Sequence, residues 1–279
     1  MKLKKKIIFD VFILLSLGAL SSLSLPPFNF FLINFFTFSI FFIFLFKKLD
    51  TQPNKKNFFF YGWLFGFGYF LTNIYWITIS LTFDQNFNFL IPFAIFLIPA
   101  FLALFYGIFT LIFCIISFKN VLSTFFLFSL LFGLTEYIRG NILTGFPWNL
   151  IIYSFSKNIN FLSFLSVIGT YSFNLIIISF FTAPAIYILR KSKKEIIVSI
   201  ILLLFSTLLL TYGFSYKKSF LSKELKENPY TIRVINSNIS LDRFYKNTET
   251  KRVIDELINI SSPDPTKKIF FLWPEGIIP

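Results

Sequence analysis

One carboxylate near the end of the chain stands where α/β folds place their chemistry. Glu275 follows Pro274, which ends the short apolar run 269–273. If that run is a strand, Glu275 lies at its carboxyl end, where α/β sheets bind their ligands, and a carboxylate there can act as a general base. The alternative is a solvated glutamate that only follows the strand. Glu275 is therefore the candidate for proton transfer.

A second candidate region is the aromatic segment 145–148, with the sequence Gly-Phe-Pro-Trp, which follows Glu136 and Arg139. The two charged residues are spaced i, i+3 and can pair on one helix face, and charges at a membrane edge hint at function. The alternative is that the tryptophan anchors the interface and that Arg139 extends to lipid headgroups. We predict that a lipid entrance is lined by Arg139, Phe146, Pro147 and Trp148.

A third cluster of polar and aromatic side chains lies near the end of an earlier apolar block. It comprises Asn73, Tyr75, Trp76 and Ser80. Such side chains can face a lipid, with Trp76 as a candidate binding residue. The alternative is that they join neighbouring helices.

The residues that the chain lacks exclude several kinds of chemistry. It has no histidine and one cysteine, Cys114, which lies inside an apolar block. Ser-His and Cys-His catalysis, an intramolecular disulfide and cysteine-based metal sites are therefore excluded within this sequence. No Walker A pattern is present, and Gly66-Phe67-Gly68 lacks the third glycine of a dinucleotide-binding loop. We expect neither a cofactor nor a metal ion.

The elements that must position these residues are membrane-spanning helices. Hydrophobic residues make up 56% of the chain and charged residues 14%, against about a quarter charged in soluble domains. The apolar residues form blocks near the ~20 residues that a helix needs to cross a bilayer. We predict a polytopic α-helical membrane domain at 1–213 with about seven spans, at 7–24, 28–46, 58–80, 89–117, 121–138, 160–189 and 196–213.

The net charge of +13 is distributed as a topology signal rather than as a nucleic-acid-binding surface. Lys and Arg collect in the short cytoplasmic loops of membrane proteins. The short loops on one side hold only Arg139 and Lys157, so the N-terminus is predicted to be cytoplasmic and residues after about 213 to be outside. The basic residues on the other side are Lys2, Lys4, Lys5, Lys6, Lys47, Lys48, Lys55, Lys56, Lys119, Arg190, Lys191, Lys193 and Lys194.

The last part of the chain, 214–279, changes character and predicts the start of an α/β domain. Residues 217–228 are charged and predict a linker. Residues 231–239 are rich in β-branched side chains and predict a buried strand, and 269–273 predicts a second one. Between them, 248–260 carries apolar side chains at helical spacing. Strand–helix–strand is the opening of an α/β fold.

In their order along the chain, these motifs resemble those of bacterial apolipoprotein N-acyltransferase over nearly the whole length. The most specific match is 136–148, with Glu-Tyr-Ile-Arg-Gly and then Leu-Thr-Gly-Phe-Pro-Trp. The segment 66–80, with Gly-Phe-Gly and Asn-Ile-Tyr-Trp, resembles the third-span pattern of the family, and the Pro-Ala-Phe-Leu-Ala of 99–103 is also similar. In the tail, 233–239 is similar to the opening strand of the nitrilase-like domain. The segment Trp273-Pro274-Glu275, together with Pro279, is similar to the catalytic glutamate motif.

The resemblance implies a lipoprotein-maturing enzyme of the bacterial inner membrane. Family members transfer an acyl chain from a phospholipid to the α-amino group of the diacylglyceryl-cysteine of an apolipoprotein. The route is ping-pong through a thioester, and a Glu-Lys-Cys triad carries it. The carboxylate takes the proton of the thiol, and the lysine stabilises the developing oxyanion. By resemblance, Glu275 is that glutamate, and the tail is the first strand–helix–strand of a nitrilase-like α/β-β/α domain.

The chain departs from the family pattern after Glu275, four residues before Pro279. The lysine and cysteine of the family lie further on, as does a final membrane helix, and Cys114 is no substitute because it lies in the fourth predicted span. We therefore expect an N-terminal portion that is inactive alone, which an intact mass above 32.7 kDa for the natural product would support. The alternatives are a non-catalytic truncated remnant and a lipid-binding or transport protein. Internal repeats and mid-span charges, which would favour transport, are lacking.

Overall fold

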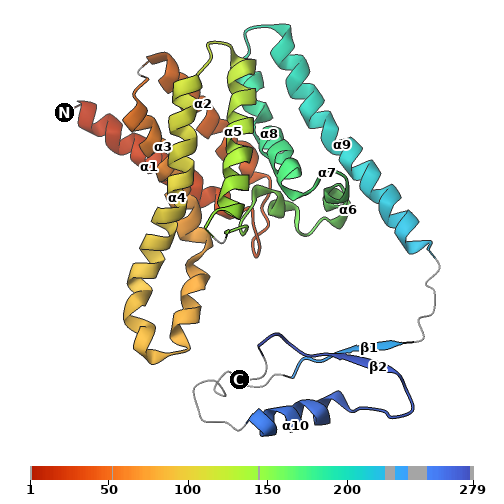
Figure 1. Cartoon of the computed structure of the whole chain (residues 1–279). Helices are drawn as coiled ribbons and strands as arrows, with labels where there is room; N and C mark the ends of the chain where they lie inside the picture. The colour runs from red at the N-terminus through yellow and green to blue at the C-terminus, as the bar shows by residue number, and fades with distance from the viewer. Residues whose placement is uncertain (1, 52, 144, 224–229, 238–249, 277–279) are drawn as a thin grey trace. The chain divides into compact units, whose positions relative to one another are not determined.

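The computed structural model describes residues 2–51, 53–143, 145–223, 230–237 and 250–276. These residues form two compact units, Met1–Leu221 and Ser222–Pro279 (Figure 1). The first unit is helical, and the described part of the second contains a two-stranded sheet and a helix.

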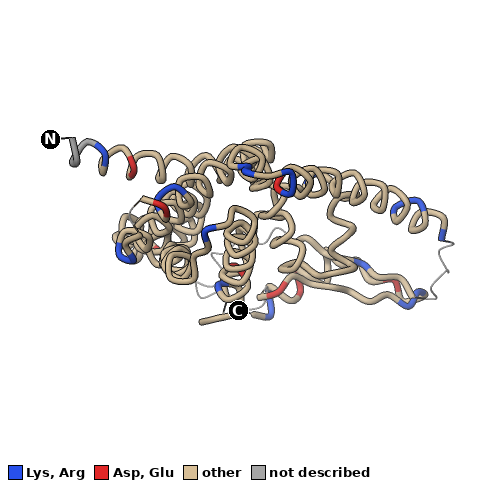
Figure 2. Tube along the Cα trace, turned by 90° about the horizontal axis from the view of Figure 1, so that it is seen from above, with Lys and Arg blue, Asp and Glu red and all other residues tan. Residues whose placement is uncertain are grey.

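The helical unit is built from helices joined by short turns. Their bounds are α1 (Lys2–Ser22), α2 (Ile33–Thr51), α3 (Lys55–Asn73), η1 (Tyr75–Thr82), η2 (Gln85–Leu90), α4 (Ile91–Ile116), α5 (Val121–Asn141), η3 (Ile151–Phe155), α6 (Ile159–Leu162), α7 (Leu165–Ile168), α8 (Thr170–Ile188) and α9 (Lys193–Leu221). Helix α3 packs against α1 and α4, and α8 packs against α2, α5 and α9. Figure 2 shows the long stretches of the helices that carry no charge.

Four described helical segments are long and apolar enough to cross a membrane. They are Gln85–Ile116, which joins η2 and α4, and helices α5, α8 and α9. Helices α3 and η1 add a fifth if this pair, bent by 48°, counts as one span. Helix α1 covers most of the first predicted span, whereas α2 begins at Ile33, five residues after the predicted start of the second span, and continues to Thr51. Both helices contain charged residues, such as Asp10 and Lys48, and neither is among the four apolar segments. The predicted number of about seven spans is therefore not confirmed.

Asp10 and Lys48 form an ion pair between α1 and α2. The ammonium group of Lys48 also lies 5.0 Å from the ring centre of Phe44 and 5.3 Å from that of Tyr61. A charge inside an apolar helix is costly unless it is paired, so this pair makes the packing of α1 on α2 compatible with the charges that both carry.

Three other predicted spans also differ from the structure. The span expected at 160–189 is broken, because α6 and α7 are single turns and α8 begins only after Gly169. Gly169 has a φ of +79°, a left-handed conformation that favours glycine. The span expected at 58–80 bends after Asn73, where α3 gives way to η1. Helix α9 continues to Leu221, into the predicted linker 217–228, whose residues 224–228 lie outside the described part of the chain.

Helices α3 and α4 approach each other at Gly62. A Cβ atom at this position would collide with the backbone carbonyl oxygen of Tyr106 and the hydroxyl group of Thr110. That hydroxyl donates a hydrogen bond across the interface to the carbonyl oxygen of Phe58, at 2.6 Å. The spacing of Gly62 and Gly66 predicts close helix packing, and the structure confirms it.

We expect Gly62→Ala to destabilise the helical unit by about 1–3 kcal/mol, because the new methyl group would clash with backbone atoms of α4, which cannot move away as a flexible side chain could. Gly107→Ala is the matched control, since the atoms nearest to its Cβ would belong to the side-chain ring of Phe59 and not to backbone. The measurement is the midpoint of thermal unfolding in detergent. Equal shifts for the two variants would contradict the role of Gly62.

The second unit contains the expected strand–helix–strand. Strands β1 (Thr231–Val234) and β2 (Ile269–Leu272) pair in parallel, with Thr231 opposite Ile269. Helix α10 (Thr250–Ser261) lies between them in the sequence. The predicted strand 231–239 thus ends early, and its last residues, like the first residues of the predicted helix 248–260, lie outside the described part. Two strands do not distinguish one α/β fold from another, so the nitrilase-like domain stays a prediction.

Helix α10 buries one apolar face. Val253 and Leu257 are buried, and Trp273 packs against both. The indole N–H of Trp273 donates to the hydroxyl oxygen of Ser261, at 2.9 Å. Arg233 of β1 donates to the backbone carbonyl oxygens of Ser261 and residue 262, at 2.6 and 2.8 Å. These contacts attach the helix to both strands.

Candidate functional site

A fully buried ion pair lies near the C-terminal end of α5. Glu136 and Arg139 have side-chain exposures of 0%, and the guanidinium group binds both carboxylate oxygens, with Nη2 at 2.7 Å from Oε2 and Nε at 3.3 Å from Oε1. The spacing i, i+3 places the two side chains on one helix face, as expected. Two contacts of this kind give the pair a fixed geometry.

The same guanidinium group holds the aromatic segment in place. Nη1 of Arg139 donates to the carbonyl oxygen of Phe146 at 2.7 Å and to that of Trp148 at 3.0 Å. The hydroxyl group of Tyr69 on α3 donates to the carbonyl oxygen of Asn149, at 2.7 Å. We call residues 145–149 the latched loop, because these three hydrogen bonds tie its backbone to α5 and α3.

The backbone of the latched loop needs two unusual conformations. Gly145 has a φ of +80° and Asn149 a φ of +62°, values that glycine and asparagine adopt most readily. The N–H of Phe146 turns back to the carbonyl oxygen of Arg139, at 3.0 Å. The loop is therefore a tight reversal, and Thr144, which precedes it, lies outside the described residues.

This geometry excludes the alternative in which Arg139 extends to lipid headgroups. Its side chain does not extend to lipid headgroups, because the residue is 1% exposed and its guanidinium group donates four hydrogen bonds to Glu136 and the latched loop. A buried charge must be paired and hydrogen-bonded, and these partners meet that need. Arg139 positions the loop from beneath.

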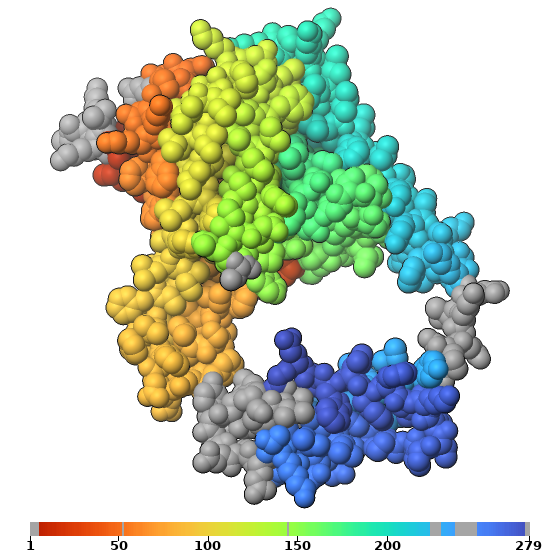
Figure 3. Space-filling view, in the orientation of Figure 1, coloured from red at the N-terminus to blue at the C-terminus, as the bar shows by residue number. Residues whose placement is uncertain are grey.

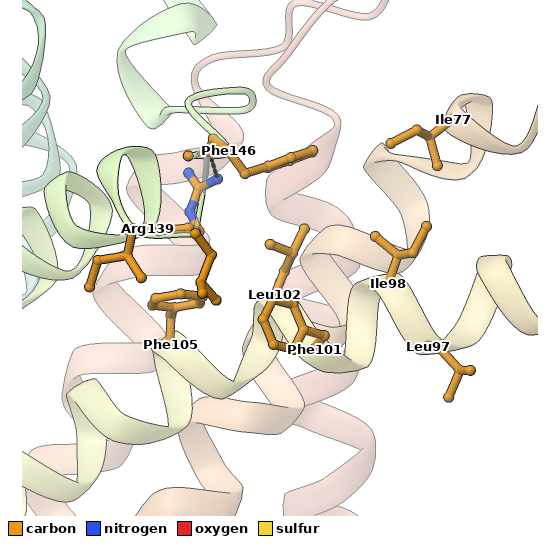
Figure 4. A pocket seen from close by; sticks show the side chains of 11 residues that line it. Ile77, Leu97, Ile98, Phe101, Leu102, Phe105, Arg139 and Phe146 are labelled. Carbon is orange, nitrogen blue, oxygen red and sulfur yellow. Dashed lines mark hydrogen bonds between the residues drawn. The ribbon is translucent and has the colours of Figure 1, made fainter. Parts of the chain in front are cut away.

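An apolar cavity of about 360 Å³ lies on the Phe146 side of the latched loop. Figure 4 shows the ring of Phe146 extending over it toward Ile77 of η1, with Leu102 and Phe105 of α4 on the other side. Among the described residues that line it, Arg139 alone is charged. Helices η1 and η2 and the first turns of α4 form a projecting hairpin (Figures 1 and 3), and this cavity lies where α4 meets the loop.

A second cavity, of about 390 Å³, lies on the Trp148 side. Trp76 and Trp148 meet there edge to face, with ring centres 6.3 Å apart. Asn73 and Tyr75 also line it, together with residues before α2, whereas Ser80 does not. None of the lining residues in the described part of the chain is charged. The structure thus brings Trp76, Phe146 and Trp148 to one end of the helical unit, and among them only Trp76 and Trp148 line the same cavity.

Glu275 belongs to the second unit. It is exposed, in a turn that follows β2, and the next residue, Gly276, has a φ of +64°. Its place at the carboxyl end of a strand in a parallel pair agrees with the expected position. Cys114, by contrast, is a buried residue in the last turns of α4.

Sequence reasoning missed the two tyrosines beneath the latched loop. Tyr69 and Tyr106 are 1% and 0% exposed, and their rings stack with centres 6.3 Å apart. The available signal was a phenolic hydroxyl group among phenylalanines, because a buried tyrosine usually finds a hydrogen-bond partner. Tyr69 does so, whereas the hydroxyl group of Tyr106 makes no hydrogen bond with a described residue. Phe70, whose ring lies 5.2 Å from the guanidinium carbon of Arg139, gave no signal of its own.

The helices and the latched loop define a polytopic membrane protein with two cavities at one end of its helical unit. Residues 17–183 match the family model described as the apolipoprotein N-acyltransferase N-terminal domain. The chain therefore belongs to the apolipoprotein N-acyltransferase family.

Curated relatives agree with this assignment. The chain is 29% identical over 273 residues to an apolipoprotein N-acyltransferase of Allorhizobium ampelinum, covering 94% of this chain and 50% of that protein. It is 37% identical over 204 residues to one of Rickettsia prowazekii, covering 72% and 39%. The chain thus spans about half the length of the curated relatives it matches over most of its own length. Apolar helices and these relatives identify a bacterial inner-membrane protein.

Proposed function

We propose that this chain provides the membrane part of an apolipoprotein N-acyltransferase, which transfers an acyl chain from a phospholipid to the α-amino group of the diacylglyceryl-cysteine of an apolipoprotein. The observation that carries the proposal is the latched loop with an apolar cavity beside it. Membership of the family and the two cavities at one end of the helices support the same function.

The apolar cavity suits the acyl chain of the donor. Its walls are side chains of Ile, Leu and Phe, which exclude water and offer no hydrogen bond to a charged group. Its one buried cation, Arg139, is already neutralised by Glu136. In this proposal, Phe146 forms the wall of the lipid entrance, and Trp148 and Trp76 line the neighbouring cavity. Pro147, which was predicted to line the entrance, lies between them in the latched loop and lines neither of these two cavities.

In this proposal, Glu275 is the general base that takes the proton of a cysteine thiol, so that the thiolate can attack the ester carbonyl of the phospholipid. The ester C–O bond then breaks, a thioester forms, and the lysophospholipid leaves as an alcohol after its oxygen takes the proton back from Glu275. Cys114 does not serve as that nucleophile, because it is buried in α4. Of the Glu-Lys-Cys triad implied by the resemblance, only Glu275 has a counterpart in this sequence. The excess of Lys and Arg in the loops at the opposite end supports a cytoplasmic N-terminus and a periplasmic latched loop.

The proposal predicts that filling the apolar cavity weakens donor binding. Ile98 lines the cavity from α4 and is partly buried. We expect Ile98→Trp, introduced into the acyl-transferring enzyme, to raise the KM for the phospholipid at least tenfold with little change in kcat, because the indole occupies the space of the chain.

Phe96→Trp is the matched control. Phe96 lies on α4, is 56% exposed and does not line the cavity. The variant Phe96→Trp therefore places the same indole ring outside the cavity. An equal rise in KM for both variants, or no rise for Ile98→Trp, would refute the assignment of the cavity to the acyl donor.

A further inference from the structure

A third cavity lies between α9 and the rest of the helical unit, away from the latched loop. Its volume is about 480 Å³, within the range of ligand sites. We call it the α9 cavity. Residues of α9, α8, α6 and η3, and of the segment before α2, line it.

The interior of the α9 cavity is apolar and aromatic. Phe155 stacks on Phe161 with ring centres 4.1 Å apart, and Phe31 lies 5.0 Å from Phe155. Ser206 and Leu210 of α9, one helical turn apart, close the remaining side. Only 17% of the apolar stretch of α9 is buried inside the protein, against 61% of that of α8. Figure 1 shows α9 diverging from α8 toward the C-terminal end of α9. The α9 cavity is therefore bordered by a helix that faces lipid.

The rim of the α9 cavity carries a positive charge. Lys157 is exposed and makes no ion pair with a described residue. Arg139, the other basic residue in the short loops at this end, is buried against Glu136. The hydroxyl group of Ser156 donates to the side-chain oxygen of Asn29 at 3.1 Å, which joins the two segments that form the rim.

A buried polar atom inside the α9 cavity makes no hydrogen bond within the described part of the chain. Ser154 lines the cavity and is 3% exposed, and its hydroxyl oxygen makes no hydrogen bond with any described residue. Buried hydroxyl groups are almost always hydrogen-bonded. An ester oxygen entering from the membrane would accept this hydrogen bond.

We propose that the α9 cavity binds one anionic phospholipid of the membrane. Its phosphate group lies at Lys157, an ester oxygen accepts a hydrogen bond from Ser154, and one acyl chain lies among the phenylalanines beside α9. This lipid is distinct from the acyl donor, so the inference does not rest on the proposed function.

The test is native mass spectrometry of the purified chain after incubation with equal amounts of phosphatidylglycerol and phosphatidylcholine. We expect one phosphatidylglycerol to remain bound preferentially. Lys157→Gln lowers the preference for phosphatidylglycerol about fivefold, the effect of one lysine near an anionic surface. Ser206→Phe lowers the retention of either lipid at least tenfold, because the ring fills the cavity from α9.

Each variant has a matched control on α9. Thr207 is exposed, does not line the cavity and, like Ser206, donates to the carbonyl oxygen three residues earlier, so Thr207→Phe leaves retention unchanged. Lys218 is exposed and lies outside the cavity lining, so Lys218→Gln leaves the lipid preference unchanged. Equal effects of a variant and its control, or no preference for phosphatidylglycerol in the wild type, would overturn the proposal.

Discussion

Replacing Arg139 by Met is expected to destabilise the helical unit by about 3–5 kcal/mol, because it leaves the buried carboxylate of Glu136 without its partner. The carbonyl oxygens of Phe146 and Trp148 lose their donors in the same step. The latched loop then keeps only the hydrogen bond from Tyr69 among its three side-chain ties. Thermal unfolding in detergent measures the loss of stability.

Arg139→Lys separates charge from geometry. Lysine keeps the positive charge but has no planar fork with which to bind the Glu136 carboxylate and two carbonyl oxygens together, so we expect an intermediate loss of stability. Arg190→Met is the control, since Arg190 is exposed and donates to the carbonyl oxygen of Tyr187. Full stability of Arg139→Lys would show that charge alone holds the loop. If Arg190→Met lost as much stability as Arg139→Met, the loss would not come from breaking the buried pair of Glu136 and Arg139.

Glu275→Gln is expected to reduce formation of the acyl-enzyme by about 10²–10⁴-fold, the usual contribution of a general base. Glutamine has nearly the same shape but cannot take a proton from a thiol. The measurement is the amount of thioester formed in one turnover, in membranes that contain the acyl-transferring enzyme. Membrane insertion should be unchanged, since Glu275 is exposed and lies in the second unit.

Glu256→Gln is the matched control. Glu256 is an exposed glutamate on α10 of the same unit, so the change removes an equal charge at another place. Normal thioester formation by Glu275→Gln would rule out its role as base. A similar loss in Glu256→Gln would assign the effect to the net charge of the unit instead.

Local patterns along the chain were sufficient for the class of the protein. Blocks of apolar residues predict helices of membrane length, and the structure contains a helix in each predicted block. The predicted number of about seven spans is not confirmed, because α1 and α2 contain the charges of Asp10 and Lys48, which pair with each other in the structure. The break at Gly169 was also missed, since α6 and α7 are as apolar as the helix that follows.

The sequence by itself determined the residues of the candidate site but not their roles. Order and spacing singled out Arg139, the segment 145–148 and Trp76, because charged residues and tryptophans are rare among the apolar blocks: the chain has only four tryptophans. Only the tertiary structure decided that Arg139 is buried beneath the loop and that Tyr69, from another helix, holds the end of that loop. The physical reason is that hydrogen bonds between distant segments satisfy buried polar groups, and no local pattern specifies which segments will meet.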